Sequence, residues 1–364
     1  HNENREFIPD INTLPFPARH LVQLSKYRGM NFPVNMMTSR GCPHSCIFCV
    51  GHRMVGHKVR YFDVKRVVDE FEMLAGLGFN QINIVDDLFT SNKKRCMDIC
   101  DGIIARGIKH PWSAFARVDT VHEDLLLKLK EAGCVSLCFG VESGNQEILD
   151  RIKKRTTLDK CRKAADLCRK TGMKPMASYI LGLPGETEET VRKSFEFAEE
   201  MAIPYGFHIL APFPGTEVRM DADKYGISVL TDDWDLYDAN RSVCSTGSIS
   251  TEKVDSIAGE FNSKISRRID ELRKMNSEGI KLNGMEQELV SGLESFFFSR
   301  TLITEKLVER FRGNGGNPAE EFASFIAAET GLNAAFVTEE VRRLIKLRCI
   351  EERSTGLSSN FTWL

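Results

Sequence analysis

The stretch Gly41-Cys42-Pro43-His44-Ser45-Cys46-Ile47-Phe48-Cys49 places three cysteines at the spacing C-x3-C-x2-C. It directly follows an apolar run, residues 34–38, that is typical of a strand. A loop of this length can surround one compact object and direct three thiolates at it. Thiolates are soft ligands that suit an iron–sulfur cluster or zinc. The stretch therefore predicts a metal centre held by Cys42, Cys46 and Cys49.

Two kinds of metal centre fit three cysteines. A structural zinc site takes four protein ligands, and His44 or His52 is available as the fourth. A cubane held by three cysteines instead leaves one iron without a protein ligand, and that iron can bind a substrate or a cofactor. We favour the cubane and keep a non-catalytic zinc-binding module as the alternative.

Outward from this stretch, strand-like and helix-like segments alternate as far as about residue 212. Strands that alternate with helices of ~10–15 residues are typical of βαβ units and a parallel sheet. The sequence thus predicts an α/β fold, a partial TIM-like (β/α)6 barrel, with the cysteine loop at the functional ends of its strands. The predicted strands are 34–39, 81–86, 111–116, 134–141, 174–181 and 206–212, and the predicted helices are 63–77, 92–106, 122–132, 157–172, 187–202 and 251–274.

The chain divides into three predicted parts. Residues 1–30 are punctuated by prolines and are expected to form a linker or a lead-in strand. The barrel core is expected to occupy residues 31–280, with an irregular segment at 216–250. A small C-terminal helical domain, winged-helix-like, is predicted for 281–364, with helices at 285–312, 318–331 and 337–348 and a final hairpin that turns at Gly356. Such folds serve protein contacts as often as nucleic-acid contacts, so the fold does not decide the function.

Polar residues and glycines stand at the ends of the predicted strands. A carboxylate that ends a buried strand is costly without a polar partner, so Glu142 is well placed to bond a ligand, with a solvated loop acid as the alternative. Helix capping is the alternative for Asp87, and a solvated charged face is the alternative for Lys154. The candidate ligand-binding residues at these strand ends are Asp86, Asp87, Arg117, Glu142 and Gly182.

The cysteine spacing, with the aromatic Phe48 just before the third cysteine, resembles that of the radical S-adenosylmethionine (radical SAM) superfamily. G-x-E-S-G at 140–144 and G-x-P-G-E-T at 182–187 follow in the order expected of that family, so the resemblance covers about residues 30–215. It implies a 4Fe–4S cluster on the three cysteines whose open iron binds SAM. One electron then cleaves SAM to methionine and a 5′-deoxyadenosyl radical.

The same resemblance implies cofactor-binding roles for the strand-end residues and adds Phe48, Ser143, Lys154 and Pro212 to the candidates. Asp86 and Asp87 would serve the amino group of SAM, Glu142 and Ser143 its ribose and carboxylate, and Lys154 its carboxylate. Gly182 would line the adenine side, Pro212 belongs to the motif that ends the sixth strand, and Arg117 is expected to point into the cavity. No catalytic residue is assigned, and the substrate is not readable because substrate choice resides in loops.

Three features resemble the cobalamin-dependent members in particular: the lead-in segment 8–19, D-D-x-F-T at 86–90 and P-x-P-G-T at 212–216. The predicted function is SAM cleavage for cobalamin-assisted methylation or cyclisation. The alternative is a cobalamin-independent radical SAM oxidation, rearrangement or methylthiolation. The expected partners are a small-molecule substrate, an electron donor such as flavodoxin or ferredoxin, and a cobalamin-binding domain upstream.

Composition sets further bounds. The net charge of −2 gives no basic field for nucleic acid, and no apolar run of ~18 residues predicts a membrane span. Eleven cysteines suit a reducing cytoplasm. Those outside the motif, such as Cys96, Cys100, Cys134 and Cys138, are expected to be small buried hydrophobes. The chain lacks an initiator methionine, so a fragment, a processed chain or a trimmed chain is expected.

Overall fold

The largest sheet described has six strands in the structure, a computed structural model that describes residues 5–355 and 358–364. Its order is β1-β4-β5-β6-β7-β8. All pairings from β4 to β8 are parallel, as expected of successive βαβ units. The strands are β1 (Val34–Met36), β4 (Ile82–Ile84), β5 (Trp112–Ala116), β6 (Cys134–Glu142), β7 (Lys174–Leu181) and β8 (Tyr205–Ile209). The predicted partial (β/α)6 barrel is thereby confirmed.

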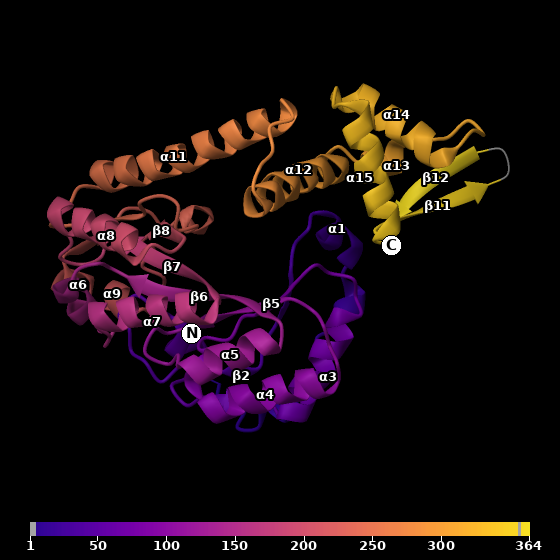
Figure 1. Ribbon diagram of the computed structural model, residues 1–364. Helices are drawn as coiled ribbons and strands as arrows, with labels where there is room; N and C mark the ends of the chain where they lie inside the picture. Colours follow the sequence, from indigo (N-terminus) through magenta and orange to yellow (C-terminus); the bar gives the residue numbers. More distant parts are fainter. Residues whose placement is uncertain (1–4, 356–357) are drawn as a thin grey trace. The chain divides into compact units, whose positions relative to one another are not determined.

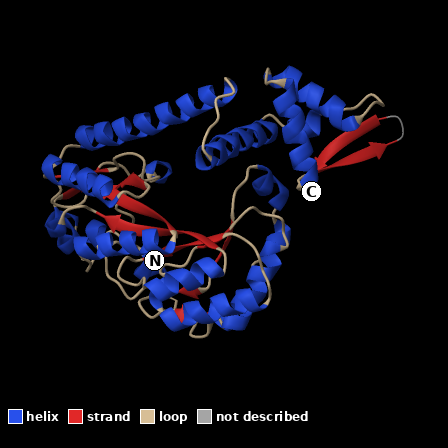
Figure 2. Ribbon diagram, viewed as in Figure 1, coloured by secondary structure: helices blue, strands red, loops and turns tan. Residues whose placement is uncertain are grey.

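Helices connect the successive strands (Figures 1 and 2). Their first turns are set by side-chain caps, because Asn92, Asn145, Thr157 and Thr187 each accept a hydrogen bond from a backbone N–H three residues on. Helix α4 packs on α5, α5 on α7 and α7 on α8. The helices are α3 (Val64–Ala75), α4 (Lys93–Ala105), α5 (Glu123–Glu131), α6 (Gln146–Arg151), α7 (Leu158–Thr171) and α8 (Glu188–Met201).

Short elements surround the sheet. The strands β2 (Ser39–Arg40) and β3 (Arg60–Tyr61) pair as an antiparallel ribbon. In the sequence, helix α2 (Gly51–Val55) lies between these two strands. Within 216–250, predicted to be irregular, the structure has α9 (Glu217–Met220), α10 (Ala222–Tyr225), β9 (Ile227–Val229), η4 (Trp234–Leu236) and β10 (Cys244–Thr246). The remaining short helices are η1 (Ile11–Thr13), η2 (Arg19–Leu21), α1 (Leu24–Gly29) and η3 (Phe89–Ser91).

Contacts divide the chain into two compact units. The first consists of the segment that ends at Pro15 together with Asn35–Met73 and Ile82–Ile265. The second consists of Phe16–Val34, Leu74–Gln81 and Ser266–Leu364, so it combines early and late segments of the chain. The sequential domain limits 1–30, 31–280 and 281–364 stay a prediction.

The C-terminal segment is helical and ends in a hairpin. The prediction of one continuous helix at 285–312 is wrong, because Lys306, with a φ of 52°, separates α12 (Gly284–Thr304) from α13 (Leu307–Arg310). The predicted hairpin is present, with Thr355 opposite Ser358, and its turn at Gly356 lies outside the described residues. The elements are α11 (Thr251–Ser277), α12 (Gly284–Thr304), α13 (Leu307–Arg310), α14 (Pro318–Thr330), α15 (Ala334–Lys346), β11 (Ile350–Thr355) and β12 (Ser358–Trp363). Across the described ranges, no helix has both the length and the apolar character needed to cross a bilayer.

Candidate active site

The three motif cysteines lie in the loop between β2 and α2. Ile47 anchors this loop, because it is fully buried, its N–H donates to the Ile152 carbonyl at 3.1 Å and its carbonyl accepts from the Val218 N–H at 3.0 Å. At the start of the loop Gly41 has a φ of 113°, and a Cβ there would lie 2.5 Å from the carbonyl oxygen of Lys58. Only glycine fits such a position. The protein chain itself therefore fixes the path of the loop.

Burial and neighbouring charges act on the motif thiols in opposite directions. Burial raises the pKa of Cys42 and of Cys46, whereas the nearby Arg117 guanidinium lowers the pKa of both. The Cys49 Sγ accepts from the Gly51 N–H at 3.3 Å. Burial is the larger effect and leaves the pKa of Cys42 and of Cys46 above its usual value, and the cations beside the loop oppose this rise.

The cysteines outside the motif have different surroundings. Cys96, Cys100 and Cys134 are buried, which agrees with the expectation of small buried hydrophobes, whereas Cys138 is only half-buried. Burial raises the pKa of Cys96 to about 12. It also raises the pKa of Cys161 and of Cys168 to about 11. Thiols with such pKa values stay protonated at neutral pH and are poor metal ligands.

The two adjacent carboxylates after β4 face different partners. Asp86 is 2% exposed and accepts hydrogen bonds from the N–H and hydroxyl groups of both Thr38 and Ser39. It therefore binds the chain after β1 to the end of β4. Asp87 is exposed, and its Oδ2 accepts from the Gly41 N–H at 3.3 Å. Asp87 thus lies beside the cysteine loop, and a contact of either carboxylate with SAM stays a prediction.

Glu142 and Lys154 form a buried ion pair at the end of β6. Lys154 Nζ lies 2.6 Å from Glu142 Oε1, and each residue is 7% exposed. Glu142 has a φ of 70° at an irregularity where the register between β6 and β7 shifts. A Cβ on Gly140 would lie 2.3 Å from Glu142 Oε1, so this glycine makes room for the carboxylate. Strained backbone of this kind often occurs at ligand-binding sites.

Arg117 follows β5 and is also buried, at 7% exposed. Its Nε and Nη2 donate to Oδ1 and Oδ2 of Asp119, both at 2.9 Å, and Nη2 also donates to the Lys154 carbonyl at 2.8 Å. Burial raises the pKa of Asp119, but the bonds from Arg117 outweigh this and hold the pKa below its usual value. The sequence reasoning identified Arg117 and missed Asp119, although the acid lies two residues away in Ala116-Arg117-Val118-Asp119.

Ser143 turns toward helix α8. Its Oγ lies 3.2 Å from Ser194 Oγ and accepts from the Asn145 N–H. A Cβ on Gly144 would lie 2.7 Å from Ser194 Cα, so the chain approaches α8 closely here. Ser143 therefore helps to join β6 to α8, and its contact with SAM stays a prediction.

Gly182 follows β7 with a φ of 79°, and its N–H donates to Glu186 Oε2 at 2.7 Å. Glu186 is fully buried and also accepts from the Leu183 N–H, but its Oε1 has no hydrogen-bond partner in the described part of the chain. Burial raises the pKa of Glu186 to about 8. The sequence reasoning included Glu186 in the motif but did not predict that one of its carboxylate oxygens is buried without a hydrogen-bond partner. That property depends on the packing around the turn.

The last two candidates have apolar surroundings. Phe48 is half-buried against a hydrophobic cluster that contains Leu149 and Ile152. Pro212 is buried beyond the end of β8, and its carbonyl accepts from Arg219 Nη1 at 3.3 Å. Their contacts with a cofactor stay predictions.

The donor chemistry of the loop fits an iron–sulfur cluster, because the motif supplies three thiols with cations beside them. Within residues 5–355 and 358–364, no three His, Cys, Asp or Glu side chains converge on a point that would hold a single metal ion. A cubane distributes its thiolate ligands over several irons, so its donors do not need to meet at one point.

Comparisons with known proteins agree with this chemistry. Residues 36–198 match the radical SAM superfamily. The chain is 34% identical over 256 residues to an uncharacterized methyltransferase of Pyrococcus horikoshii, which covers 69% of this chain and 55% of that protein. It is 28% identical over 291 residues to the cytidylyl-2-hydroxyethylphosphonate methyltransferase of Streptomyces wedmorensis, which covers 72% of this chain and 53% of that protein. The chain thus spans about half the length of these curated relatives.

Solved structures share the fold. The cobalamin-dependent radical enzyme OxsB, with aqua-cobalamin and SAM bound, aligns with a TM-score of 0.53 and 16% identity over 87% of this chain and 55% of its own. The methyltransferase TsrM from Kitasatospora setae aligns with a TM-score of 0.53 and 22% identity over 63% of this chain and 46% of its own. The family match, the curated relatives and the shared fold lead to one conclusion: this chain belongs to the radical SAM superfamily.

Proposed function

We propose that this chain is the core of an enzyme that cleaves SAM at a 4Fe–4S cluster held by Cys42, Cys46 and Cys49. The observation that carries the proposal is the placement of these cysteines in one anchored loop, with Asp87 bonded to the start of that loop and Arg117 acting on its thiols. The bound cluster supplies one electron to SAM, giving methionine and a 5′-deoxyadenosyl radical.

The charged side chains at the strand ends suit the parts of SAM. The exposed Asp87 carboxylate beside the loop suits an ammonium group. Glu142 bonds Lys154 through Oε1, and no described residue donates to its Oε2, so that oxygen is available to accept from ribose hydroxyls. The cations of Arg117 and Lys154 suit a carboxylate. The buried ion pair holds these groups in place without the ligand, which lowers the ordering cost of binding.

The experiment is anaerobic reconstitution with iron and sulfide, followed by reduction in the presence of SAM. We expect about four irons per chain and a broad absorbance band near ~400 nm, as iron–thiolate ligation implies. Dithionite, flavodoxin or ferredoxin as reductant should then yield 5′-deoxyadenosine. A colourless chain that takes up zinc and forms no 5′-deoxyadenosine would reject this function in favour of the zinc-binding module.

We further propose cobalamin-assisted methylation as the reaction of this enzyme. Support comes from the two relatives named methyltransferases above. Ring cyclisation is the second candidate, because the anaerobic magnesium-protoporphyrin IX monomethyl ester cyclase of Rubrivivax gelatinosus is 31% identical over 202 residues, covering 51% of this chain and 36% of that enzyme. A methylase that uses SAM both as methyl donor and as radical source should form S-adenosylhomocysteine and 5′-deoxyadenosine in about equal amounts. A cyclase should form mainly 5′-deoxyadenosine, and full turnover without a corrinoid would reject both candidates.

A further inference from the structure

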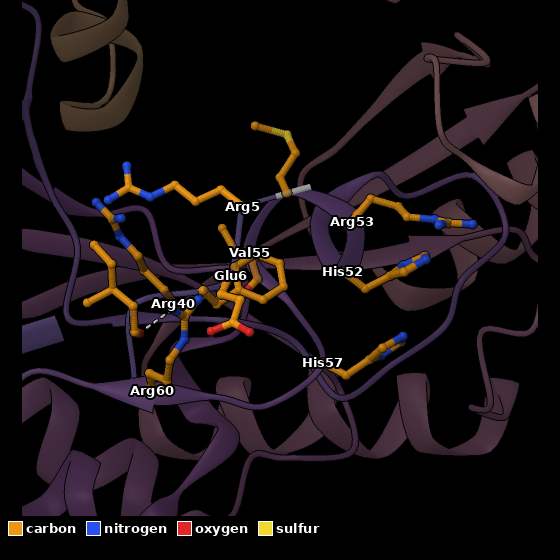
Figure 3. Close-up of a pocket in the computed structure, with 11 residues that line it drawn as sticks. Arg5, Glu6, Arg40, His52, Arg53, Val55, His57 and Arg60 are labelled. Carbon is orange, nitrogen blue, oxygen red and sulfur yellow. Dashed lines mark hydrogen bonds between the residues drawn. The ribbon is translucent and has the colours of Figure 1, made fainter. Parts of the chain in front are cut away.

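A cavity of about 800 Å³ lies beside the cysteine loop, in the first unit (Figure 3). This volume falls in the range of small-molecule sites. The cavity borders the loop at both ends, because Arg40 precedes Gly41 and helix α2 follows Cys49. Its lining is rich in groups that carry or can carry positive charge: Arg5, Arg40, Arg53, Arg60, His52 and His57. Glu6 is the acid among the lining residues.

One of these arginines builds the wall of the cavity. Arg60 donates from Nη1 to the Ile8 carbonyl at 2.7 Å and from Nη2 to the Val55 carbonyl at 2.6 Å. Its guanidinium also lies over the Phe7 ring, 5.0 Å from the centroid. These contacts attach the segment around Phe7 to the end of α2, so the wall is formed before any ligand arrives.

The other three arginines have no such partners. Within the described ranges, Arg5, Arg40 and Arg53 form no ion pair, and the Arg40 Nε is buried without a hydrogen-bond partner. The ribbon pairs Arg40 directly with Arg60, and like charges opposite each other in a ribbon are destabilising. An anion in the cavity would offset this repulsion and satisfy the donors.

The cavity also offers flat surfaces. The rings of His52 and His57 stack with centroids 4.7 Å apart, and the Nδ1 of His52 is buried without a hydrogen-bond partner. The Phe7 ring lies over Gly56, where a Cβ would be 3.1 Å from the ring. Stacked rings and an aromatic face favour a ligand with a planar part in addition to its charge.

We propose that this cavity binds a phosphorylated small molecule of nucleotide size, with its phosphate groups held by Arg5 and Arg40, whose side chains lie on one side of the cavity, while Arg53 and the two histidine rings lie on the other side (Figure 3). Guanidinium groups recognise phosphate through paired hydrogen bonds in a fixed plane, and two of them suit a ligand with more than one negative charge. None of the residues assigned above to SAM lines this cavity. The site is therefore separate from the proposed SAM site and does not rest on the proposed reaction.

Calorimetric titration of the reconstituted chain with ADP and with inorganic pyrophosphate tests this site. SAM is kept at saturating concentration, so that ADP cannot report on the adenine side of the SAM site. We expect one equivalent of either probe to bind. Arg5→Gln and Arg40→Gln, on the same side of the cavity, should each weaken binding about tenfold or more, as the loss of a charge-assisted hydrogen bond implies. Arg192→Gln, an exposed arginine on α8 outside the cavity, is the matched control and should leave affinity unchanged.

Three results would overturn the proposal. They are the absence of ADP and pyrophosphate binding, an equal loss of affinity in the Arg192→Gln control, and binding of citrate as tight as that of ADP, which would exclude a preference for phosphate. Cluster absorbance shows whether each variant is folded. If the reconstituted chain binds ADP but does not cleave SAM, the proposed function is rejected and the proposal of this phosphate site is retained.

Discussion

Lys154 Nζ lies 2.6 Å from Glu142 Oε1 at the end of β6, where both residues are 7% exposed. The two residues are twelve positions apart, and Glu142 reaches its partner from a left-handed backbone conformation with a φ of 70°. A buried charge is tolerated only when it is paired. Each of these side chains therefore depends on the other.

We expect Glu142→Gln to lower the free energy of unfolding by about 3–5 kcal/mol, because it leaves the Lys154 ammonium buried without its counter-charge. Urea unfolding of the reconstituted chain measures this. The double variant Glu142→Gln/Lys154→Met should recover much of the stability, since it removes both charges. An unchanged single variant would mean that the lysine is solvated in solution.

The strands were predictable because their alternation with helices is a local pattern. The predicted strand 174–181 coincides with β7, Lys174–Leu181. The predicted strand 34–39 is too long, because β1 ends at Met36 and Asp86, far away in sequence, takes the N–H groups of Thr38 and Ser39. Such an ending depends on tertiary structure, which no local pattern contains.

The candidate site divides in the same way. Residue types at fixed spacing indicated the cysteine loop, positions at strand ends indicated Arg117 and Glu142, and the family resemblance indicated Lys154. The partners of these residues were not predictable, because the ion pair requires the irregularity at Glu142 and the space at Gly140. The basic cavity was not predicted from the sequence, because it combines residues from separate segments of the chain. These segments are brought together by the ribbon of β2 and β3.

The motif cysteines should differ from the core cysteines in one measurement. Cys42→Ala, Cys46→Ala and Cys49→Ala should each abolish the iron content and the absorbance near ~400 nm, because a thiolate ligand is lost. Cys168→Ala is the control, since that thiol is buried and its pKa is raised to about 11. Normal iron loading after removal of all three motif cysteines would place the cluster elsewhere.

Gly144→Ala should destabilise the fold by about 1–3 kcal/mol, the usual cost of overpacking. The new Cβ would lie 2.7 Å from the Lys193 carbonyl, from Ser194 Cα and from Phe197 Cβ, so α8 would have to move. Gly247→Ala, where no atom lies within 4 Å of the added Cβ, is the matched control. Thermal unfolding of the two variants measures the difference. Equal midpoint temperatures would show that α8 can shift without loss of stability.

Glu186 should make the stability of this protein fall as the pH rises above the usual range of a carboxyl group. Burial raises its pKa in the folded chain from 4.5 to about 8. Between these values the folded chain keeps a proton that the unfolded chain has lost, so ionisation favours unfolding. Below pH 4.5 both forms are protonated, and the contribution to stability is fully present.

The variant Glu186→Gln isolates this effect, because the amide retains an oxygen for the Gly182 and Leu183 N–H groups and cannot ionise. The unfolding free energy of the native protein minus that of the variant should fall by up to about 5 kcal/mol across this window, at ~1.36 kcal/mol per pH unit. Urea unfolding at a series of pH values measures the difference. A difference that stays constant throughout would mean that solvent or a bound ligand reaches Oε1 in the folded protein and keeps the carboxylate ionised.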